Sequence, residues 1–125
     1  MNKNIPLYYN EDKTKFGVLV SYGFSAGWST WNEHELAYDK RVIEFWLAHQ
    51  NDKRWMREVE RYHPESPEHK EACDFFINEL GFDNCPYMGG FPDCDLEWVP
   101  VGARFRINEY DGAESLEIEN EGSWW

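Results

Sequence analysis

The stretch that decides the fold is residues 103–119, which read ARFRINEYDGAESLEIE. In its first half Phe105 and Ile107 alternate with two arginines, and in its second half Leu116 and Ile118 alternate with glutamates. A period of two predicts β-strands with one buried face and one solvated face. A Tyr-Asp-Gly turn signal joins the halves, so we predict two antiparallel strands connected by a tight turn.

The polar residues of this stretch have matching signs. Arg104 and Arg106 belong to the first predicted strand, and Glu117 and Glu119 belong to the second. Opposite charges that face each other across an antiparallel pair contribute roughly 0.2–1 kcal/mol each. We therefore expect these four side chains to form cross-strand ion pairs that partly neutralise the wet face.

Working outward, runs of β-favouring residues predict strands elsewhere in the chain. Residues 5–9 form a short first strand, with a proline that favours an edge or a strand start. Residues 16–22 (FGVLVSY) form the second, and the two are expected to pair as a hairpin. Residues 96–101 form a third, which precedes the strands at 103–108 and 115–119.

Helical spacing of apolar residues fills the region between these strands. A first helix has Asp39 as its N-cap or, if it starts earlier, as an interior residue, and Asn51-Asp52 is expected to separate it from a second helix over 53–62. The third has a clear start and end, because Ser66 can cap it and Gly81 can terminate it in the left-handed conformation. The order β-β-α-α-β-β-β predicts an α+β fold, with an antiparallel sheet of about five strands and two or three helices on one face.

Length and charge limit the function. The chain has 125 residues, with 12 Lys plus Arg against 24 Asp plus Glu, a net charge of −12. We expect a single domain over residues 1–125. A protein with this much negative charge is not expected to bind nucleic acid or anionic lipid directly, because both are polyanions that would repel it. No apolar run is long enough to span a membrane and no signal peptide is recognisable, so we expect a cytoplasmic protein.

Aromatic residues are abundant, at 18% of the chain, and many of them fall in two Gly-rich loops. Tryptophan and tyrosine are enriched where proteins bind partners, although rings in a small protein also serve the core. Together with the acidic C-terminal third, these loops predict a partner-binding surface. The predicted contact residues are Glu97, Glu109, Asp111, Glu114, Glu117, Glu119, Glu121, Trp28, Trp31, Tyr87, Phe91 and Trp125.

Three patterns keep alternative chemistry open. Gly23-Phe24-Ser25-Ala26-Gly27 matches the nucleophile elbow of hydrolases, but that fold needs a large parallel sheet. A nucleotide-like ligand could stack on Trp28, Trp31 or Tyr87. One histidine and three cysteines form a legitimate zinc set, although free thiols or a Cys85–Cys94 disulfide are the competing interpretations. The four candidate zinc ligands are His69, Cys73, Cys85 and Cys94.

Three stretches resemble small acidic orphan proteins encoded by bacteriophages and prophages. They are residues 27–32 (GWSTWN), 36–41 (LAYDKR) and 97–114. None of them is a motif with known chemistry, so the resemblance assigns no catalytic or binding residue. It implies a habit of the class, in which compact acidic proteins bind and block host machinery, including nucleic-acid-handling defence complexes.

The sequence therefore predicts a non-enzymatic binding protein. The expected partner is a protein with a basic surface, such as a host defence or nucleic-acid-handling protein, met in the host cytosol. Charge complementarity would speed the encounter and buried rings would supply affinity. No catalytic residue, metal or cofactor is assigned, and the oligomeric state is left open.

Overall fold

The computed structural model describes residues 5–23, 26–60 and 65–119. Its described part is α+β, which confirms the predicted class. The predicted single five-stranded sheet is wrong, because the strands form two separate antiparallel ribbons. The elements are β1 (Lys15–Ser21), α1 (Lys40–His49), α2 (Lys53–Glu60), α3 (Pro67–Asp74), β2 (Cys94–Pro100), β3 (Phe105–Tyr110) and β4 (Ala113–Ile118), with a π-helical turn (Phe75–Glu79) and three short 3-10 turns (Ser29–Trp31, His34–Ala37 and Phe91–Asp93).

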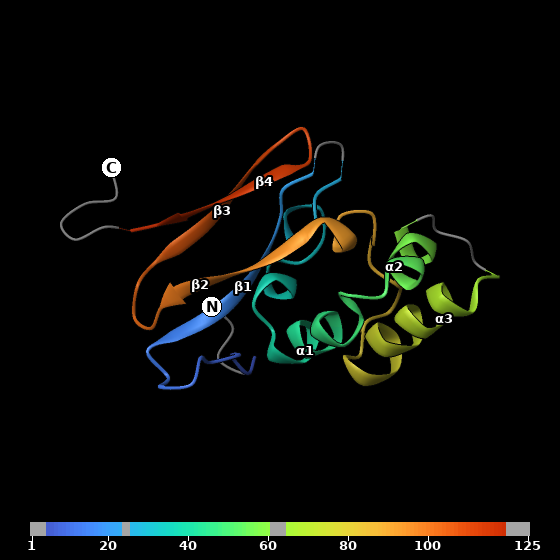
Figure 1. The fold of residues 1–125 in the computed structure, drawn as a ribbon, viewed down its shortest axis with the longest axis horizontal. Helices are drawn as coiled ribbons and strands as arrows, with labels where there is room; N and C mark the ends of the chain where they lie inside the picture. Colours follow the sequence, from blue (N-terminus) through green and yellow to red (C-terminus); the bar gives the residue numbers. More distant parts are fainter. Residues whose placement is uncertain (1–4, 24–25, 61–64, 120–125) are drawn as a thin grey trace.

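The β1–β2 ribbon lies in the middle of the molecule, between the helices and the β3–β4 ribbon (Figure 1). Strand β1 is buried on both faces from Phe16 to Ser21. Leu19 packs into a core built mainly by the three helices and the two aromatic loops. Phe16 and Val18 pack on the opposite side, against the apolar face of β3–β4. One strand therefore serves two cores.

The predicted N-terminal hairpin is almost absent from the structure. Residues 5–9 form no strand, because their pairing is limited to isolated bridges between Leu7 and Asp39 and between Tyr9 and Phe16. Strand β1 pairs along its whole length with β2 instead, for example Leu19 with Leu96. The burial of β1 from Phe16 to Ser21 stabilises that arrangement more than pairing with the short, proline-containing segment 5–9 can.

The helices begin where their sequence signals lie, while the predicted end of the second helix at residue 62 lies outside the described residues. The Asp39 side chain accepts the backbone N–H of Arg41 and caps α1. The Ser66 hydroxyl accepts the backbone N–H of His69 and caps α3, while Gly81 takes a positive φ of 80° beyond the π-helical turn. That turn shifts the helix face, so Ile77, which directly follows the buried Phe76, is exposed. No described helix has the length and apolar character needed to cross a bilayer.

The C-terminal ribbon forms as its alternation predicts. Tyr110 pairs with Ala113, and Asp111 and Gly112 between them have φ values of 54° and 90°, as a two-residue type I′ turn requires. Phe105 and Ile107 turn inward against the second core, as predicted. This ribbon is tied to the rest of the protein by contacts that also shape the candidate site.

Candidate functional site

The aromatic loops divide into a buried half and an exposed half. Trp28 and Phe91 are fully buried, with ring centroids 4.9 Å apart, and the Trp28 Nε1–H donates to the Leu36 carbonyl at 3.1 Å. Their expected role as surface anchors is therefore corrected. These two rings fill a core that the short helices alone would leave incomplete.

Glu114 is also corrected from a surface residue to a buried one, with 2% of its surface exposed. Its Oε2 accepts the backbone N–H of Trp28 at 2.7 Å and of Thr30 at 3.1 Å, together with the Thr30 hydroxyl at 2.6 Å. Its Oε1 accepts the backbone N–H of Ser21 at 2.9 Å. The alternation itself signals this position, because Glu114 lies on the same strand face as the inward-pointing Leu116 and Ile118.

The exposed half is an aromatic pair formed by Trp31 and Tyr87. Their ring centroids lie 5.4 Å apart, and 41% and 43% of the two side chains are exposed. The Asn32 side chain holds the two loops together, since it donates to the Tyr87 carbonyl at 2.8 Å and accepts the Tyr87 backbone N–H at 2.9 Å. The pair is thus fixed in place before any partner arrives.

Glu109 extends this pair toward the β3–β4 turn. Its carboxylate accepts the Trp31 Nε1–H at 3.2 Å and the Gly112 backbone N–H at 2.8 Å. The backbone bond from Gly112 and the indole bond from Trp31 lower the pKa of Glu109 below its usual value. Glu109 is therefore a carboxylate at neutral pH beside a half-exposed indole, and its role as a contact residue stays a prediction.

An acidic groove of about 540 Å³ begins next to the aromatic pair, since its walls include Asn32 and Pro86, the chain neighbours of Trp31 and Tyr87. Within the described residues, its three carboxylates form no ion pair. Sequence reasoning missed this groove, although the Glu-His-Glu run at 33–35 was a signal. The carboxylates belong to Glu33, Glu35 and Asp83.

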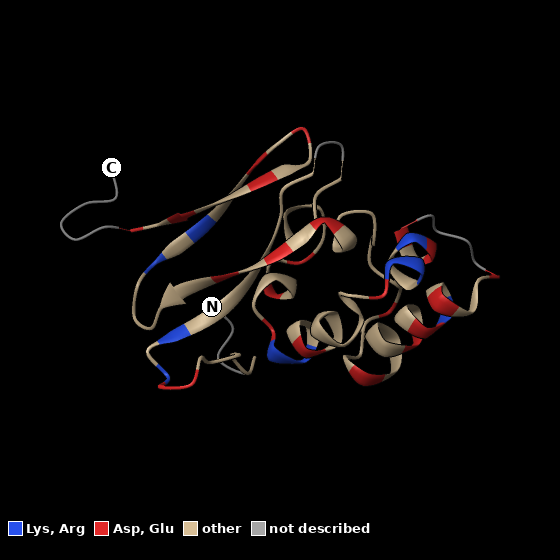
Figure 2. Cartoon of the chain, viewed as in Figure 1, with Lys and Arg blue, Asp and Glu red and all other residues tan. Residues whose placement is uncertain are grey.

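Unlike the acids of the groove, glutamates of the β3–β4 ribbon have basic neighbours, because basic and acidic positions lie side by side on these strands (Figure 2). Arg106 Nε lies 3.4 Å from Glu117 Oε1, and Arg104 Nε lies 3.5 Å from Glu119 Oε2. The predicted cross-strand pairs are confirmed. Glu117 and Glu119 are thus partly neutralised, and the ribbon offers less free negative charge than the groove.

The remaining predicted contact residues are scattered. Glu97 lies on β2, where its carboxylate accepts the Tyr22 hydroxyl at 2.8 Å, and burial together with that carboxylate raises the pKa of Tyr22. Asp111 is exposed in the β3–β4 turn. Glu121 and Trp125 lie outside the described residues, as does Ser25, the candidate nucleophile.

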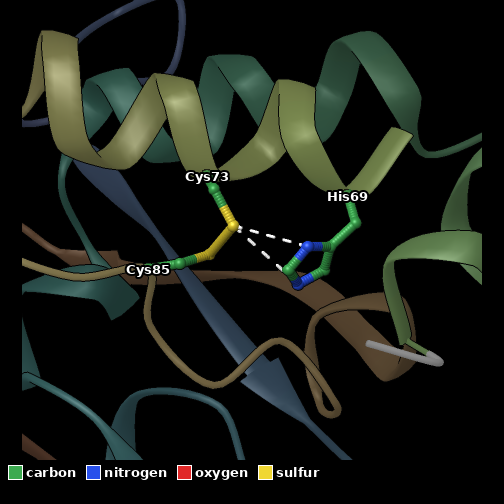
Figure 3. A group of neighbouring side chains, drawn as sticks. All are labelled: His69, Cys73 and Cys85. Carbon is green, nitrogen blue, oxygen red and sulfur yellow. Dashed lines mark hydrogen bonds between the residues drawn. A yellow bond between two sulfur atoms is a disulfide. The ribbon is translucent and has the colours of Figure 1, made fainter. Parts of the chain in front are cut away.

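The candidate zinc ligands separate into a cluster of three and an isolated fourth. His69 and Cys73 face one point from α3, and Cys85 reaches it from the loop beyond the π-helical turn (Figure 3). Cys73 and Cys85 form a disulfide, so the free-thiol interpretation is wrong for these two residues, and the alternative Cys85–Cys94 pairing is wrong as well. Cys94 is buried elsewhere, with its thiol 3.4 Å from the Gly90 carbonyl.

No protein-family model, curated protein or solved structure matches this chain at a significant level. Function therefore has to be argued from the site itself. Two features stand out among the described residues: the exposed aromatic pair beside carboxylates that form no ion pair there, and the largely buried sulfur–imidazole cluster at α3.

Proposed function

We propose that this protein is a non-enzymatic binding protein that docks an arginine- or lysine-rich segment of a protein partner on the aromatic pair and the acidic groove. The observation that carries this proposal is the position of Trp31 and Tyr87. The Trp31 indole donates to Glu109 and the Tyr87 backbone is bonded to the Asn32 side chain, so the two half-exposed rings are held next to carboxylates that have no ion pair among the described residues.

The chemistry of the surface favours a cationic partner. A guanidinium over the face of an aromatic ring gains about 0.5–2 kcal/mol, and a nearby carboxylate adds a charge-assisted hydrogen bond. The contacts within the pair already fix the rings, so little conformational entropy is lost on binding. The surplus negative charge of −12 would also speed the encounter with a basic partner.

A basic groove that handles nucleic acid presents this kind of segment. The proposal therefore includes the expectation that the partner is a host defence or nucleic-acid-handling protein of the cytosol, a choice that rests on the resemblance to phage proteins. The mode of action would be occlusion, because an acidic protein seated in such a groove excludes the nucleic acid phosphates that compete for the same cations.

The nucleotide-binding alternative receives less support from the site. Trp28, one of its three stacking candidates, is fully buried. The other two rings, Trp31 and Tyr87, contact each other and lie beside Glu109 and the acidic groove. Carboxylates so close to the rings would repel the phosphates of a nucleotide.

A direct test uses a capped octa-arginine peptide as the probe and nuclear magnetic resonance to locate it. We expect the Trp31 indole signal to shift on titration and the affinity to fall steeply with salt. Trp31→Ala should weaken binding about tenfold or more, as truncation of a hot-spot ring does. Tyr110→Ala, which removes the most exposed ring on the described surface, is the matched control and should bind normally.

A second pair of variants separates the groove from the ribbon. The triple substitution Glu33→Gln, Glu35→Gln and Asp83→Asn should remove most of the peptide affinity, whereas Glu117→Gln with Glu119→Gln should remove little. Equal effects of both sets, or shifts that map to β3–β4 and spare Trp31, would refute the proposed docking site.

A further inference from the structure

The cluster on α3 has the donor set of a metal site. His69 and Cys73 are separated by one helical turn, so both side chains leave the same face of α3. Cys85 approaches from the loop that follows the π-helical turn, with its Cα 4.8 Å from that of Cys73. The imidazole nitrogen and the two sulfurs all lie within 4.8 Å of one another (Figure 3).

The distances fit tetrahedral zinc once the sulfurs are reduced. With Zn–S bonds of about 2.3 Å and Zn–N bonds of about 2.0–2.1 Å, a tetrahedron has S···N edges of about 3.5–3.6 Å and S···S edges of about 3.8 Å. Cys73 Sγ already lies 3.5 Å from His69 Nδ1. Rotation of the two cysteine side chains would have to set the other two edges, which join Cys85 Sγ to Cys73 Sγ and to the imidazole nitrogen and whose atoms already lie within 4.8 Å of one another.

We propose that, in the reduced protein, His69, Cys73 and Cys85 bind Zn²⁺, with a water molecule as the fourth ligand, and that the Cys73–Cys85 disulfide is the alternative, metal-free state of the same site. The proposal is independent of the docking function, because it uses none of the residues of the aromatic pair or the groove. Both states tie the loop at Cys85 to α3.

The surroundings support a preorganised site. His69 is 5% exposed and Cys73 and Cys85 are half-buried, so a bound ion would be shielded on most sides. The Ser66 cap fixes the first turn of α3, where His69 is located. Cys85 packs against the aromatic core, which limits the positions its sulfur can reach.

The two states interconvert by a balanced reaction. Two equivalents of a small thiol reduce the Cys73–Cys85 bond, giving two cysteine thiols and one disulfide of the small thiol. Zn²⁺ then binds both sulfurs as thiolates and displaces two protons to solvent. In the reverse direction, a disulfide reagent takes two electrons from the thiolates, reforms the S–S bond and releases Zn²⁺.

The test measures metal binding by the whole chain. Protein reduced with a thiol, then freed of it under anaerobic conditions, is titrated with Co²⁺, which reports tetrahedral thiolate ligation by its charge-transfer and visible absorption bands. Zn²⁺ should then displace Co²⁺ at one equivalent per chain. Oxidation by a disulfide reagent should release the metal, as a chromogenic chelator would detect.

Variants assign the ligands. Cys85→Ser and His69→Gln should each weaken Zn²⁺ binding at least tenfold, whereas Cys94→Ala should leave it unchanged, because Cys94 lies outside the cluster. Circular dichroism checks that each variant is folded. Failure of the folded, reduced wild-type protein to bind one equivalent of Co²⁺, or equal loss in Cys94→Ala and Cys85→Ser, would overturn the proposal.

Discussion

The carboxylate of Glu114 accepts the backbone N–H of Trp28 at 2.7 Å, and this contact joins the β3–β4 ribbon to the loop that carries the exposed aromatic pair. The same carboxylate also accepts donors from Ser21 and Thr30. Four donors surround one buried carboxylate, and three of them are backbone N–H groups. The Glu114 carboxylate therefore supplies the hydrogen-bond acceptors that a neighbouring strand would supply to these backbone N–H groups.

Replacing Glu114 should lower the stability of the whole fold. In Glu114→Ala, buried N–H groups lose their acceptor, which costs about 3 kcal/mol. Glu114→Gln should cost about 2 kcal/mol, because whichever way the amide is turned, its –NH₂ group faces a donor. Urea denaturation followed by tryptophan fluorescence measures both. Glu117→Ala, which removes a surface ion pair with Arg106 and an exposed hydrogen bond from Asn108, is the control and should change stability by less than about 1 kcal/mol.

Gly90 marks a second place where the two aromatic loops meet. A Cβ on Gly90 would collide with the carbonyl of Gly27 and lie 2.8 Å from the Ala26 carbonyl oxygen, all of them backbone atoms. Because Gly90 has an ordinary φ of −90°, the cost of Gly90→Ala is steric. We expect a loss of about 3 kcal/mol, at the upper end for overpacking, since backbone yields less than side chains.

Gly81→Ala is the matched comparison for that variant. A Cβ there meets nothing within 4 Å, so only the positive φ of 80° opposes it. The expected loss is about 1 kcal/mol. Equal losses in the two glycine variants would mean that the close approach of the loops contributes nothing, and would contradict the packing described for the site.

Local signals predicted the parts of the fold that depend on neighbours in sequence. The caps at Asp39 and Ser66, the Asp111-Gly112 turn and the arginine–glutamate pairs all form as expected. Each of these features is decided within a few residues or by one adjacent strand. Period-two alternation likewise identified which face of the C-terminal ribbon is buried.

The pairing of β1 with β2 could not be read in the same way. About 75 residues separate Leu19 from Leu96, its partner, and alternation states which face of a strand is apolar without naming its neighbour. Ring exposure in the aromatic loops is equally non-local. Trp28 and Trp31 share one loop, yet one is buried by distant residues and the other is not.

The Glu109 carboxylate gives a prediction about pH. Hydrogen bonds from Gly112 and Trp31 lower its pKa below the ordinary 4.5. A lowered folded-state pKa stabilises the fold above the unfolded-state pKa, and that contribution disappears as pH falls through the folded-state value. Trp31→Phe removes the indole donor, so the pKa of Glu109 should rise toward 4.5.

Carboxyl-carbon magnetic resonance titration of Glu109 measures this change directly. Trp98→Phe alters another partly exposed indole, which stacks on Tyr8, and should leave the Glu109 titration where it is in the wild-type protein. An identical midpoint in the wild type and in Trp31→Phe would show that the indole does not hold the carboxylate.

Cys94 should be the least reactive cysteine of the reduced protein. Burial, together with the carboxylates of Glu114, Asp93 and Asp95, raises the pKa of its thiol well above the usual value. Iodoacetamide needs the thiolate, so at pH 8 we expect native reduced protein to be alkylated at Cys73 and Cys85 and spared at Cys94. Peptide mass spectrometry distinguishes the three sites, and denatured protein provides the fully labelled reference.

The rate of Cys94 labelling then reports the stability that Glu114 supplies. If Cys94 becomes accessible only when the fold opens, its labelling rate follows the open population. A loss of about 2 kcal/mol in Glu114→Gln would speed the labelling of Cys94 roughly 30-fold, since each 1.4 kcal/mol is a factor of ten. If Cys94 of the native wild-type protein were alkylated as fast as Cys94 of the denatured protein, burial would not protect the thiol. That result would contradict the prediction.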